Sequence, residues 1–220
     1  MDWTPKTLHG RWLGRKDFEQ CLQLQLDLRE AVVAGTAPQT LLLVEHPATV
    51  TLGRRGEREH LLWDNEALAA KGMAVHETPR GGEATLHAPG QLVVYPIVRV
   101  DRRIRAHIIR MAEVTIGLFE GYGATDIQFR MDQPGVWQGQ TKVASIGIHV
   151  SRGVCVQGMS MNVNVDKSLF GALVSCGMPT VKMASLVDLV PGLEPPKLEK
   201  LARAWATTFA ESADLDLDWS

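Results

Sequence analysis

The sequence predicts an α+β fold, because it combines segments with the apolar spacing of helices and segments with the properties of strands. Residues 17–33, 104–119 and 197–213 carry apolar side chains every three or four positions, which is typical of amphipathic helices. Residues 142–150 alternate with a period of two, as a strand with two different faces does. We therefore expect a mixed, largely antiparallel sheet with packed helices, formed as a single domain over residues 1–220.

The N-terminal part predicts one helix and two strands. Asp17 is a favoured residue before a helix and Gly35 a favoured residue after one, so the first helix should lie between them with Cys21 toward the core. The apolar runs at residues 40–47 and 49–53 are expected to be two strands of one sheet, interrupted by proline.

The middle of the chain predicts a short helix at residues 64–71 and then a strand–turn–strand unit. Pro89 and Gly90 suit the two central positions of a type II turn, because proline presets the first angle and glycine accepts a positive φ at the second. The turn lies near the end of residues 80–91, which begin with a strand-like run, and a second strand-like run follows at residues 92–100.

The period of two continues into a predicted hairpin. Ser151, Arg152 and Gly153 form its loop, with glycine in the left-handed conformation. Counting outward from this loop, the expected partners are Val150 with Val154, Ile146 with Gly158, Ala144 with Ser160, and Lys142 with Asn162. Lys142 would then share a face with apolar and small residues, where loss of solvent lowers the pKa of an amine.

Composition excludes several classes of protein. A formal net charge of −2 argues against nucleic-acid binding through bulk charge. Three cysteines without a Cys-x-x-Cys pair argue against a disulfide framework or a zinc site, and the glycine motifs of nucleotide-binding loops are missing. The chain has no signal-peptide pattern and no apolar run of about 18 residues. We therefore expect a cytoplasmic protein, simplest as a monomer, without a membrane span, metal or cofactor.

Two arginine clusters interrupt this near-neutral composition. The first comprises Arg54, Arg55 and Arg58, and the second comprises Arg102, Arg103 and Arg105. Each is either a solvated surface or a docking site for an acidic partner.

Lys142 and Cys176 are the candidate catalytic pair. A cysteine is a nucleophile only as its thiolate. Cys176 precedes Gly177 and Pro179 and is expected at the end of a helical turn, where the helix dipole disfavours a negative charge, so it needs a nearby cation. Both residues also have simpler explanations: Cys176 as a small core residue and Lys142 as a solvated strand residue.

Glycines around residues 80–90 are a weaker signal. Gly81 and Gly82, with the turn at Gly90, could let the backbone approach a ligand or could serve turn geometry alone. His87 is equally compatible with a site and with a core position.

Several blocks of sequence resemble, in the same order, the signature of the lipoyl(octanoyl) transferases. The blocks are residues 43–47, 51–54, 80–96, 134–137, 142–147, 149–152, Gly158, 162–166 and 176–177. They span residues 41–187, so the resemblance is far more specific than any single motif.

The resemblance implies a fold similar to the catalytic domain of lipoate and biotin protein ligases. It implies transfer of an octanoyl or lipoyl group from acyl carrier protein to a lysine of the lipoyl domains of 2-oxoacid dehydrogenases or of the glycine-cleavage H protein, the first step of endogenous protein lipoylation. By the family's pattern Cys176 carries the acyl thioester and Lys142 tunes the thiol. The acyl site would be lined by Arg80, Gly81, Gly82, Glu83, Ala84, Thr85, Leu86, His87, Ser145, Ile146, Gly147, Gly158, Met159 and Ser160.

One position departs from the family's pattern. This chain has Gln157 before Gly158, where relatives often have histidine. The expected register puts Gln157 on the face away from Lys142, so we expect no loss of catalysis. Backbone amides near Gly177 or near Gly81 and Gly82 are candidates for stabilising the oxyanion.

The sequence leaves two alternatives open. One is an ATP-dependent lipoate or biotin protein ligase of the same fold, which needs no cysteine. The other is a non-catalytic acyl-binding module. Retention of both Cys176 and Lys142 favours the transferase over either alternative.

Overall fold

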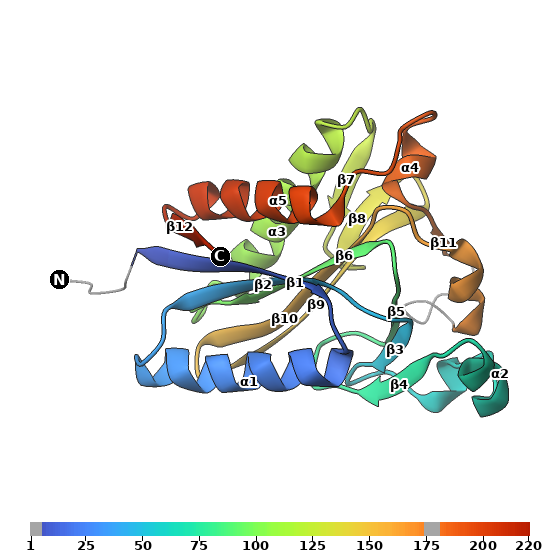
Figure 1. The fold of residues 1–220 in the computed structure, drawn as a ribbon, viewed down its shortest axis with the longest axis horizontal. Coiled ribbons are helices and arrows are strands. Elements are labelled where there is room, and N and C mark those ends of the chain that lie inside the picture. Colours follow the sequence, from blue (N-terminus) through green and yellow to red (C-terminus); the bar gives the residue numbers. More distant parts are fainter. Residues whose placement is uncertain (1–5, 174–180) are drawn as a thin grey trace.

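The computed structural model describes residues 6–173 and 181–220, which form two sheets with helices packed around them (Figure 1). The strands are β1 Thr7–Arg15, β2 Gln39–Glu45, β3 Thr49–Leu52, β4 Ala74–Glu77, β5 Ala84–His87, β6 Gln91–Ile97, β7 Ile127–Arg130, β8 Gly135–Gln138, β9 Thr141–Ser151, β10 Val154–Asn162, β11 Lys182–Met183 and β12 Asp216–Trp219. The helices are α1 Phe18–Ala34, α2 Asn65–Ala70, α3 Ile104–Glu120, α4 Leu186–Leu189 and α5 Leu198–Ser212, with short 3₁₀ turns at Arg58–His60 and Lys167–Ala172.

The main sheet is mixed and largely antiparallel, as expected. Its strand order is β12-β1-β2-β6-β10-β9-β8-β7, and β11 pairs with β9. Pairing is parallel for β1 with β12, for β1 with β2 and for β9 with β11, whereas the remaining neighbours in this sheet are antiparallel. A smaller sheet has the order β4-β3-β5.

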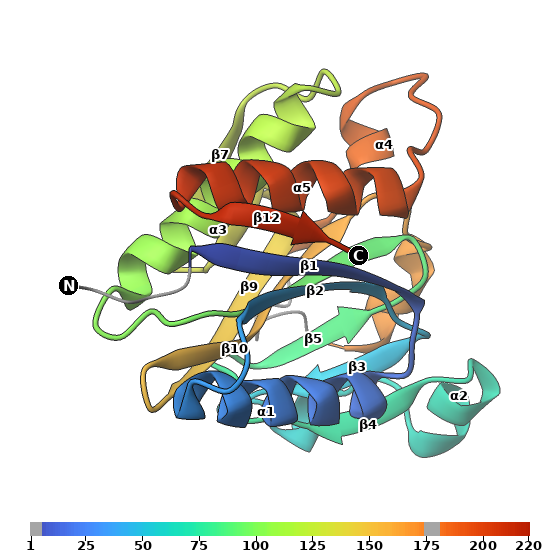
Figure 2. The ribbon, with the colours of Figure 1, turned by 60° about the vertical axis from the view of Figure 1, so that its left-hand side comes forward.

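The two faces of the main sheet are covered by different elements (Figures 1 and 2). Helices α3 and α5 cover one face, and α1 packs against the other, which the small sheet also adjoins. The alternation in β2 shows this division, because Leu41 and Leu43 pack with α3 and α5, whereas Leu42 and Val44 pack with α1. Strands that are apolar on both faces therefore form the centre of the molecule.

The predicted helices are confirmed, and side-chain caps explain where α1 and α2 begin. The Asp17 carboxylate accepts a hydrogen bond from the Gln20 N–H at 3.1 Å, and Gly35 ends α1 with φ of 73°. Asp64 caps α2 in the same way, accepting from the Ala67 N–H at 2.8 Å. Cys21 is fully buried, as expected.

The expectation that residues 40–47 and 49–53 belong to one sheet is wrong. β2 lies in the main sheet and β3 in the small one, because the chain changes direction at Pro47. The type II turn at Pro89 and Gly90 is confirmed by a φ of 88° at Gly90 and by the Gln91 N–H bond to the Ala88 carbonyl at 3.1 Å. This turn leads from the small sheet to the main sheet, so β5 and β6 are not a hairpin.

The hairpin of β9 and β10 is confirmed, but its register is shifted by one residue. Ser151 pairs with Val154, so the loop is only Arg152 and Gly153, both with positive φ. The observed pairs include Ile146 with Met159, Ser145 with Ser160, Gly147 with Gly158, and Ala144 with Met161. The three-residue loop was the wrong choice because Arg152 accepts the left-handed conformation that glycine alone was expected to adopt.

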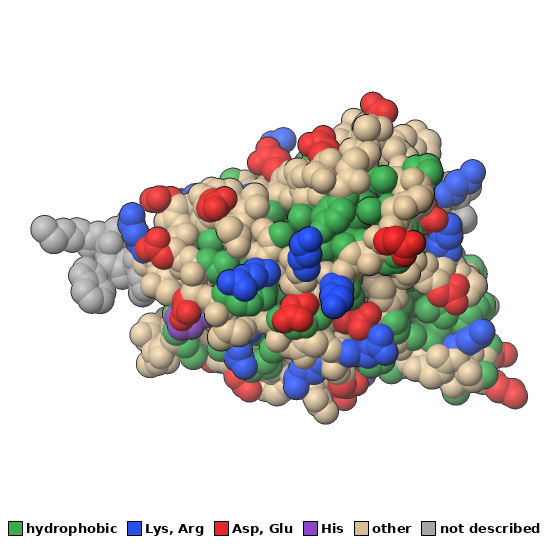
Figure 3. All heavy atoms as spheres, turned by 45° about the horizontal axis from the view of Figure 1, so that its top comes forward, with side chains coloured by type: hydrophobic (Ala, Val, Ile, Leu, Met, Phe, Trp, Pro, Cys, Tyr) green, Lys and Arg blue, Asp and Glu red, His purple; other side chains and the backbone are tan. Residues whose placement is uncertain are grey.

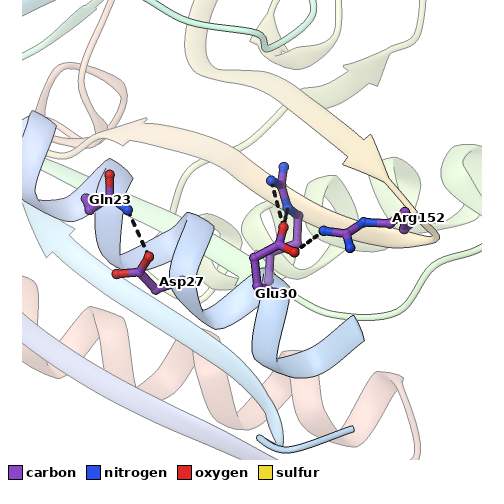
Figure 4. Close-up of polar contacts among 5 residues, drawn as sticks. Gln23, Asp27, Glu30 and Arg152 are labelled. Atoms are coloured by element: carbon purple, nitrogen blue, oxygen red, sulfur yellow. Dashed lines mark hydrogen bonds and ion pairs between the residues drawn. The ribbon is translucent and has the colours of Figure 1, made fainter. Parts of the chain in front are cut away.

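The tip of this hairpin is fixed to α1. Arg152 forms an ion pair with Glu30 near the end of α1, and Arg29 contacts the same carboxylate (Figure 4). Both arginines hold the pKa of Glu30 below its usual value. The side that carries α5 is a surface of mixed charge with apolar patches (Figure 3). Within the described residues, none of the helices is long and apolar enough to cross a membrane.

Candidate active site

A cavity of about 230 Å³ lies where the main sheet meets the segment that enters β5. Its floor comes from β6, β9 and β10, and its roof is the segment 80–85 with residues 132–134 at one side. The lining residues are Arg55, Arg80, Gly81, Gly82, Glu83, Ala84, Thr85, His87, Val93, Tyr95, Asp132, Gln133, Pro134, Lys142, Ser145, Ile146, Gly147, Gln157, Gly158, Met159 and Ser160.

Backbone hydrogen bonds hold the roof in place. The Gly81 N–H donates to the Ile148 carbonyl at 2.9 Å, which joins the roof to β9. Three further bonds join the roof to the chain after β3: Gly53 N–H to Glu83 carbonyl at 3.0 Å, Arg54 N–H to Arg80 carbonyl at 3.0 Å, and Arg55 N–H to Gly82 carbonyl at 3.1 Å. The Gly81 amide is therefore already used, which makes it unsuitable as the oxyanion donor that the sequence suggested.

Arg80 organises this roof from the inside. Its guanidinium is buried, with 6% of the residue exposed, and it donates to the Thr51 carbonyl at 2.6 Å, the Glu83 carbonyl at 2.7 Å and the Gly81 carbonyl at 3.0 Å. The Thr51 hydroxyl accepts a further bond at 2.8 Å. Because the guanidinium carries five fixed donors, it can join the roof and β3 in a way that a lysine could not.

Two glycines that pair across β9 and β10 allow the floor of the cavity to lie close to the roof and to β6. Gly147 pairs with Gly158 across β9 and β10. A Cβ at Gly147 would lie 3.1 Å from the Gly81 carbonyl oxygen in the roof, and a Cβ at Gly158 would overlap the Val94 carbonyl and lie 2.8 Å from Pro96 Cδ. Side chains here would separate the roof from the floor or β10 from β6.

Gln157 breaks the regular strand beside this floor. If the β6–β10 register is continued, Gln157 faces Pro96, which has no N–H to donate. Gln157 takes a positive φ of 61°, and its N–H turns to the Gln25 side-chain oxygen of α1 at 2.9 Å. Gln157 lines the same cavity as Lys142, so the expectation that it lies on the opposite face is wrong.

Lys142 reaches the cavity because of a β-bulge. β8 pairs Val136 with Ala144 but Trp137 with Lys142, so Val143 is an extra residue in β9. Val143 and Ala144 both lie in the core under α3 and α5, and Lys142 is returned to the cavity side. The expected pairing with Asn162 and the shared face with Ala144 are therefore wrong, although burial is confirmed at 2% exposure.

A polar cluster of two histidines and a tyrosine lies at the cavity's inner side. His46 Nδ1 is 2.6 Å from the Lys16 carbonyl and therefore donates, so Nε2 accepts from the Tyr95 hydroxyl at 2.9 Å. His87 stacks on Phe18 with a ring separation of 5.8 Å. Burial lowers the pKa of His46 to about 4 and that of His87 well below its ordinary value, so both rings are neutral at pH 7.

Comparisons with known proteins decide the family. The model for the lipoyl protein ligase A/B catalytic domain matches residues 17–210. The chain belongs to this family. It is similar to the octanoyltransferase of Solibacter usitatus, with 40% identity over 80% of this chain and 82% of the relative. It is also similar to the octanoyltransferase of Chloroflexus aggregans, with 36% identity over 93% and 95% of the two chains.

Solved structures confirm the expected fold. The archaeal lipoate protein ligase of Thermoplasma acidophilum has a TM-score of 0.75 at 17% identity, covering 97% of this chain and 87% of that chain. The biotin protein ligase of Leishmania major has a TM-score of 0.57 at 10% identity, covering 94% and 75%. The lipoyl ligase family and the biotin ligases thus share this mixed sheet.

For this member of the lipoyl protein ligase A/B family, the structure brings most of the predicted acyl-site residues together. All of them except Leu86 line the cavity, and so does Lys142. Leu86 packs in the core of the small sheet with Val50 and Leu68. Cys176 lies outside the described residues, and so does Gly177.

Sequence reasoning missed the other lining residues. Arg55, Val93, Tyr95, Gln157 and residues 132–134 line the cavity without having been predicted there. Tyr95 and Val93 lie within one of the resembling blocks, at positions that alternate toward the cavity, and this period could have indicated them. Gln157 could not have been found in this way, because its positive φ departs from the alternation.

Proposed function

We propose that this chain is an octanoyltransferase that acts through an acyl-cysteine. The chief support is similarity to octanoyltransferases at 36% to 41% identity, which this chain matches over most of their length. The cavity supports it as well, because it places Lys142 beside a floor and roof whose residues the family resemblance had indicated.

In the proposed first step the Cys176 sulfur attacks the thioester carbon of octanoyl-acyl carrier protein. Lys142 takes the thiol proton and gives it to the leaving phosphopantetheine sulfur, so one thioester is formed and one is broken. The products are octanoyl-Cys176 and the free thiol of the carrier protein.

In the second step the target lysine of a lipoyl domain enters as a neutral amine. Lys142 removes a proton as the amine attacks the acyl-cysteine, and Cys176 leaves and recovers a proton. An amide replaces a thioester, which is downhill, so the reaction needs no ATP.

The cavity is suited to bind the acyl chain. Its residues on β6, β9 and β10 include the apolar Val93, Ile146 and Met159, and Gly147 and Gly158 lie among the lining residues. Burial of each methylene contributes about 0.8 kcal/mol, so an eight-carbon chain would supply several kcal/mol of recognition.

The protein substrates are proposed to be octanoyl-acyl carrier protein as donor and lipoyl domains of 2-oxoacid dehydrogenases or the glycine-cleavage H protein as acceptors. Arg54, Arg55 and Arg58 are exposed, and Arg55 lines the cavity, so this cluster is suited to dock an acidic carrier. Arg102, Arg103 and Arg105 are exposed at the start of α3, which covers the other face of the sheet.

The test is intact-mass spectrometry of the protein after incubation with octanoyl-acyl carrier protein. Wild type should gain one octanoyl mass, and Cys176→Ala should gain none. Cys21→Ala is the matched control, because burial raises the pKa of Cys21 to about 12 and keeps its thiol unreactive. The Cys21→Ala protein should acylate like wild type.

The ligase alternative gives a different result in the same assay. A ligase would modify a lipoyl domain from free octanoate only when ATP is present, and would do so equally in Cys176→Ala. A protein that forms no acyl-enzyme and transfers no acyl group to a lipoyl domain under either condition would contradict the proposed function.

A further inference from the structure

We propose that Trp137 is the positioning residue of Lys142, whose charged ammonium it holds over the face of its indole ring. The inference deepens the proposed function, on which it rests. Lys142 Nζ lies 5.1 Å from the centre of the Trp137 ring, within the range of a cation–π contact. Both residues are buried, with exposures of 2% and 1%.

Three neighbouring strands set up this contact. Trp137 is on β8, between β7 and β9 in the sheet. The register pairs Trp137 with Lys142, and it does so only because Val143 is the extra residue of the bulge. Without the bulge the lysine would fall on the side of the sheet that α3 and α5 cover.

Gly135 provides the space for the lysine stem. A Cβ at Gly135 would lie 2.5 Å from Lys142 Cε and 3.3 Å from Nζ, and it would overlap the Ala144 carbonyl. The aliphatic part of Lys142 therefore crosses β8 at the one residue of this strand without a side chain. Stem and ammonium are guided by two residues of the same strand, Gly135 and Trp137.

The indole ring is itself fixed on two sides. Its Nε1 donates to the Gln133 carbonyl at 3.2 Å, and Gln133 lines the cavity. Arg130 of β7 lies over the same ring, with its guanidinium carbon 4.8 Å from the centre. Cations thus reach the ring from the strands on either side of β8, which keeps its plane from turning.

An aromatic face suits the proposed cycle better than a carboxylate would. Lys142 has to carry a proton while the thiolate attacks and then give the same proton to the leaving sulfur. The ring attracts the ammonium through its negative face but cannot accept its proton, so it holds the charged state without removing the proton from the reaction.

The kinetic test compares Trp137→Phe with Trp137→Leu. Phenylalanine retains an aromatic face, whereas leucine removes it and keeps an apolar side chain. We expect kcat of Trp137→Leu to fall about tenfold with little change in KM, and Trp137→Phe to remain within about threefold of wild type. Trp219→Leu, at the far edge strand β12, is the control and should keep the kcat of wild type.

A second measurement reports the contact without activity. Ring currents should shift the ε-methylene protons of Lys142 upfield in the NMR spectra of wild type and Trp137→Phe, and the shift should disappear in Trp137→Leu. The Lys142→Met variant assigns the signal by its loss. The wild-type spectrum alone tests the contact. The contact can therefore be tested even if the Trp137→Leu protein fails to fold.

The outcomes separate the inference from the proposed function. Absence of the upfield shift in wild type overturns the contact and with it the inference. A shift accompanied by equal kcat values for Trp137→Phe and Trp137→Leu overturns the positioning role, even if Cys176 is acylated. If Lys142→Met transfers acyl groups as fast as wild type, the proposed mechanism fails although the contact is present.

Discussion

The two faces of the main sheet differ in the side chains they bury. Under α3 and α5 the buried residues are almost all apolar, from Leu41 on β2 to Trp205 on α5. On the opposite face the described residues bury many polar groups, including Gln25, His46, Thr51, Arg80, His87, Gln91, Lys142 and Gln157. Buried polar groups cost free energy unless they are paired. The cavity face should therefore contribute less to the stability of the fold than the apolar face does.

The largest expected change in stability is on the apolar face. Trp205 is fully buried, stacks on Phe209 with a ring separation of 5.0 Å and donates to the Thr115 hydroxyl at 2.9 Å. Trp205→Ala should lower the free energy of unfolding by about 4 kcal/mol, measured in urea. The kcat of the folded protein should stay within about twofold of wild type, and a large loss of kcat would show that the faces are not independent.

The cavity face should react strongly to a single methyl group. Gly158→Ala places a Cβ against the Val94 carbonyl and Pro96, so β10 and β6 must separate, and we expect a loss of about 3 kcal/mol in stability together with slower transfer. Gly81→Ala is the matched control in the roof, where the nearest atom to the new Cβ is 3.7 Å away. Equal stabilities of the two variants would contradict the close approach.

Acid should destabilise both faces through buried histidines, among them His46 on the cavity face and His107 on the face that α3 and α5 cover. Burial lowers the pKa of His46 and of His107 to about 4, below the ordinary 6.5 of the unfolded chain. As pH falls from 6.5 toward 4 the unfolded chain binds protons that the folded one does not, so stability present above pH 6.5 is lost in this window.

Each of these histidines should account for about 2 kcal/mol of the stability lost between pH 7 and pH 5. His46→Gln and His107→Gln should each reduce the pH dependence of the unfolding free energy by that amount, and the double variant by the sum. Single variants that keep the full dependence of wild type would show that these rings do not cause it.

The smallest expected effect concerns the arginine clusters. Replacement of Arg54, Arg55 and Arg58 by glutamate should slow transfer from the acyl carrier protein several-fold at low salt and much less at high salt, because exposed charges are screened. The same replacement at Arg102, Arg103 and Arg105 is the comparison on the other face of the sheet. A larger effect there would move the docking site to the start of α3.

The sequence was sufficient to predict the elements with strong local signals. Asp17 and Gly35 mark the ends of α1, and Pro89 with Gly90 marks a turn, because these residue types act through their own backbone and side chains. Strand β1 and the edge strand β12 gave no such signal. β12 has only four residues, and its parallel pairing with β1 joins segments that are far apart in the sequence, which no local pattern indicates.

The lining of the cavity was predicted in most of its residues but not in its geometry. The resembling blocks indicated most of the cavity lining, whereas the expected strand register was wrong at two places, Arg152 and Val143. Both failures are local backbone choices, a left-handed non-glycine residue and an inserted strand residue, that neighbouring strands impose. A single sequence does not contain those neighbours' positions.

The link from Gln157 to Gln25 gives α1 a part in the cavity that it does not line. The Gln25 side chain accepts the Gln157 N–H, which the positive φ of Gln157 turns away from β6, and Glu30, further along the same helix, pairs with Arg152 at the hairpin tip. Helix α1 and strand β10 with its hairpin loop therefore depend on each other. A chimera that exchanges α1 with a relative has to carry the matching residues at positions 25, 30, 152 and 157. Recombination between family members should therefore succeed most often when its crossovers leave this pair of elements intact.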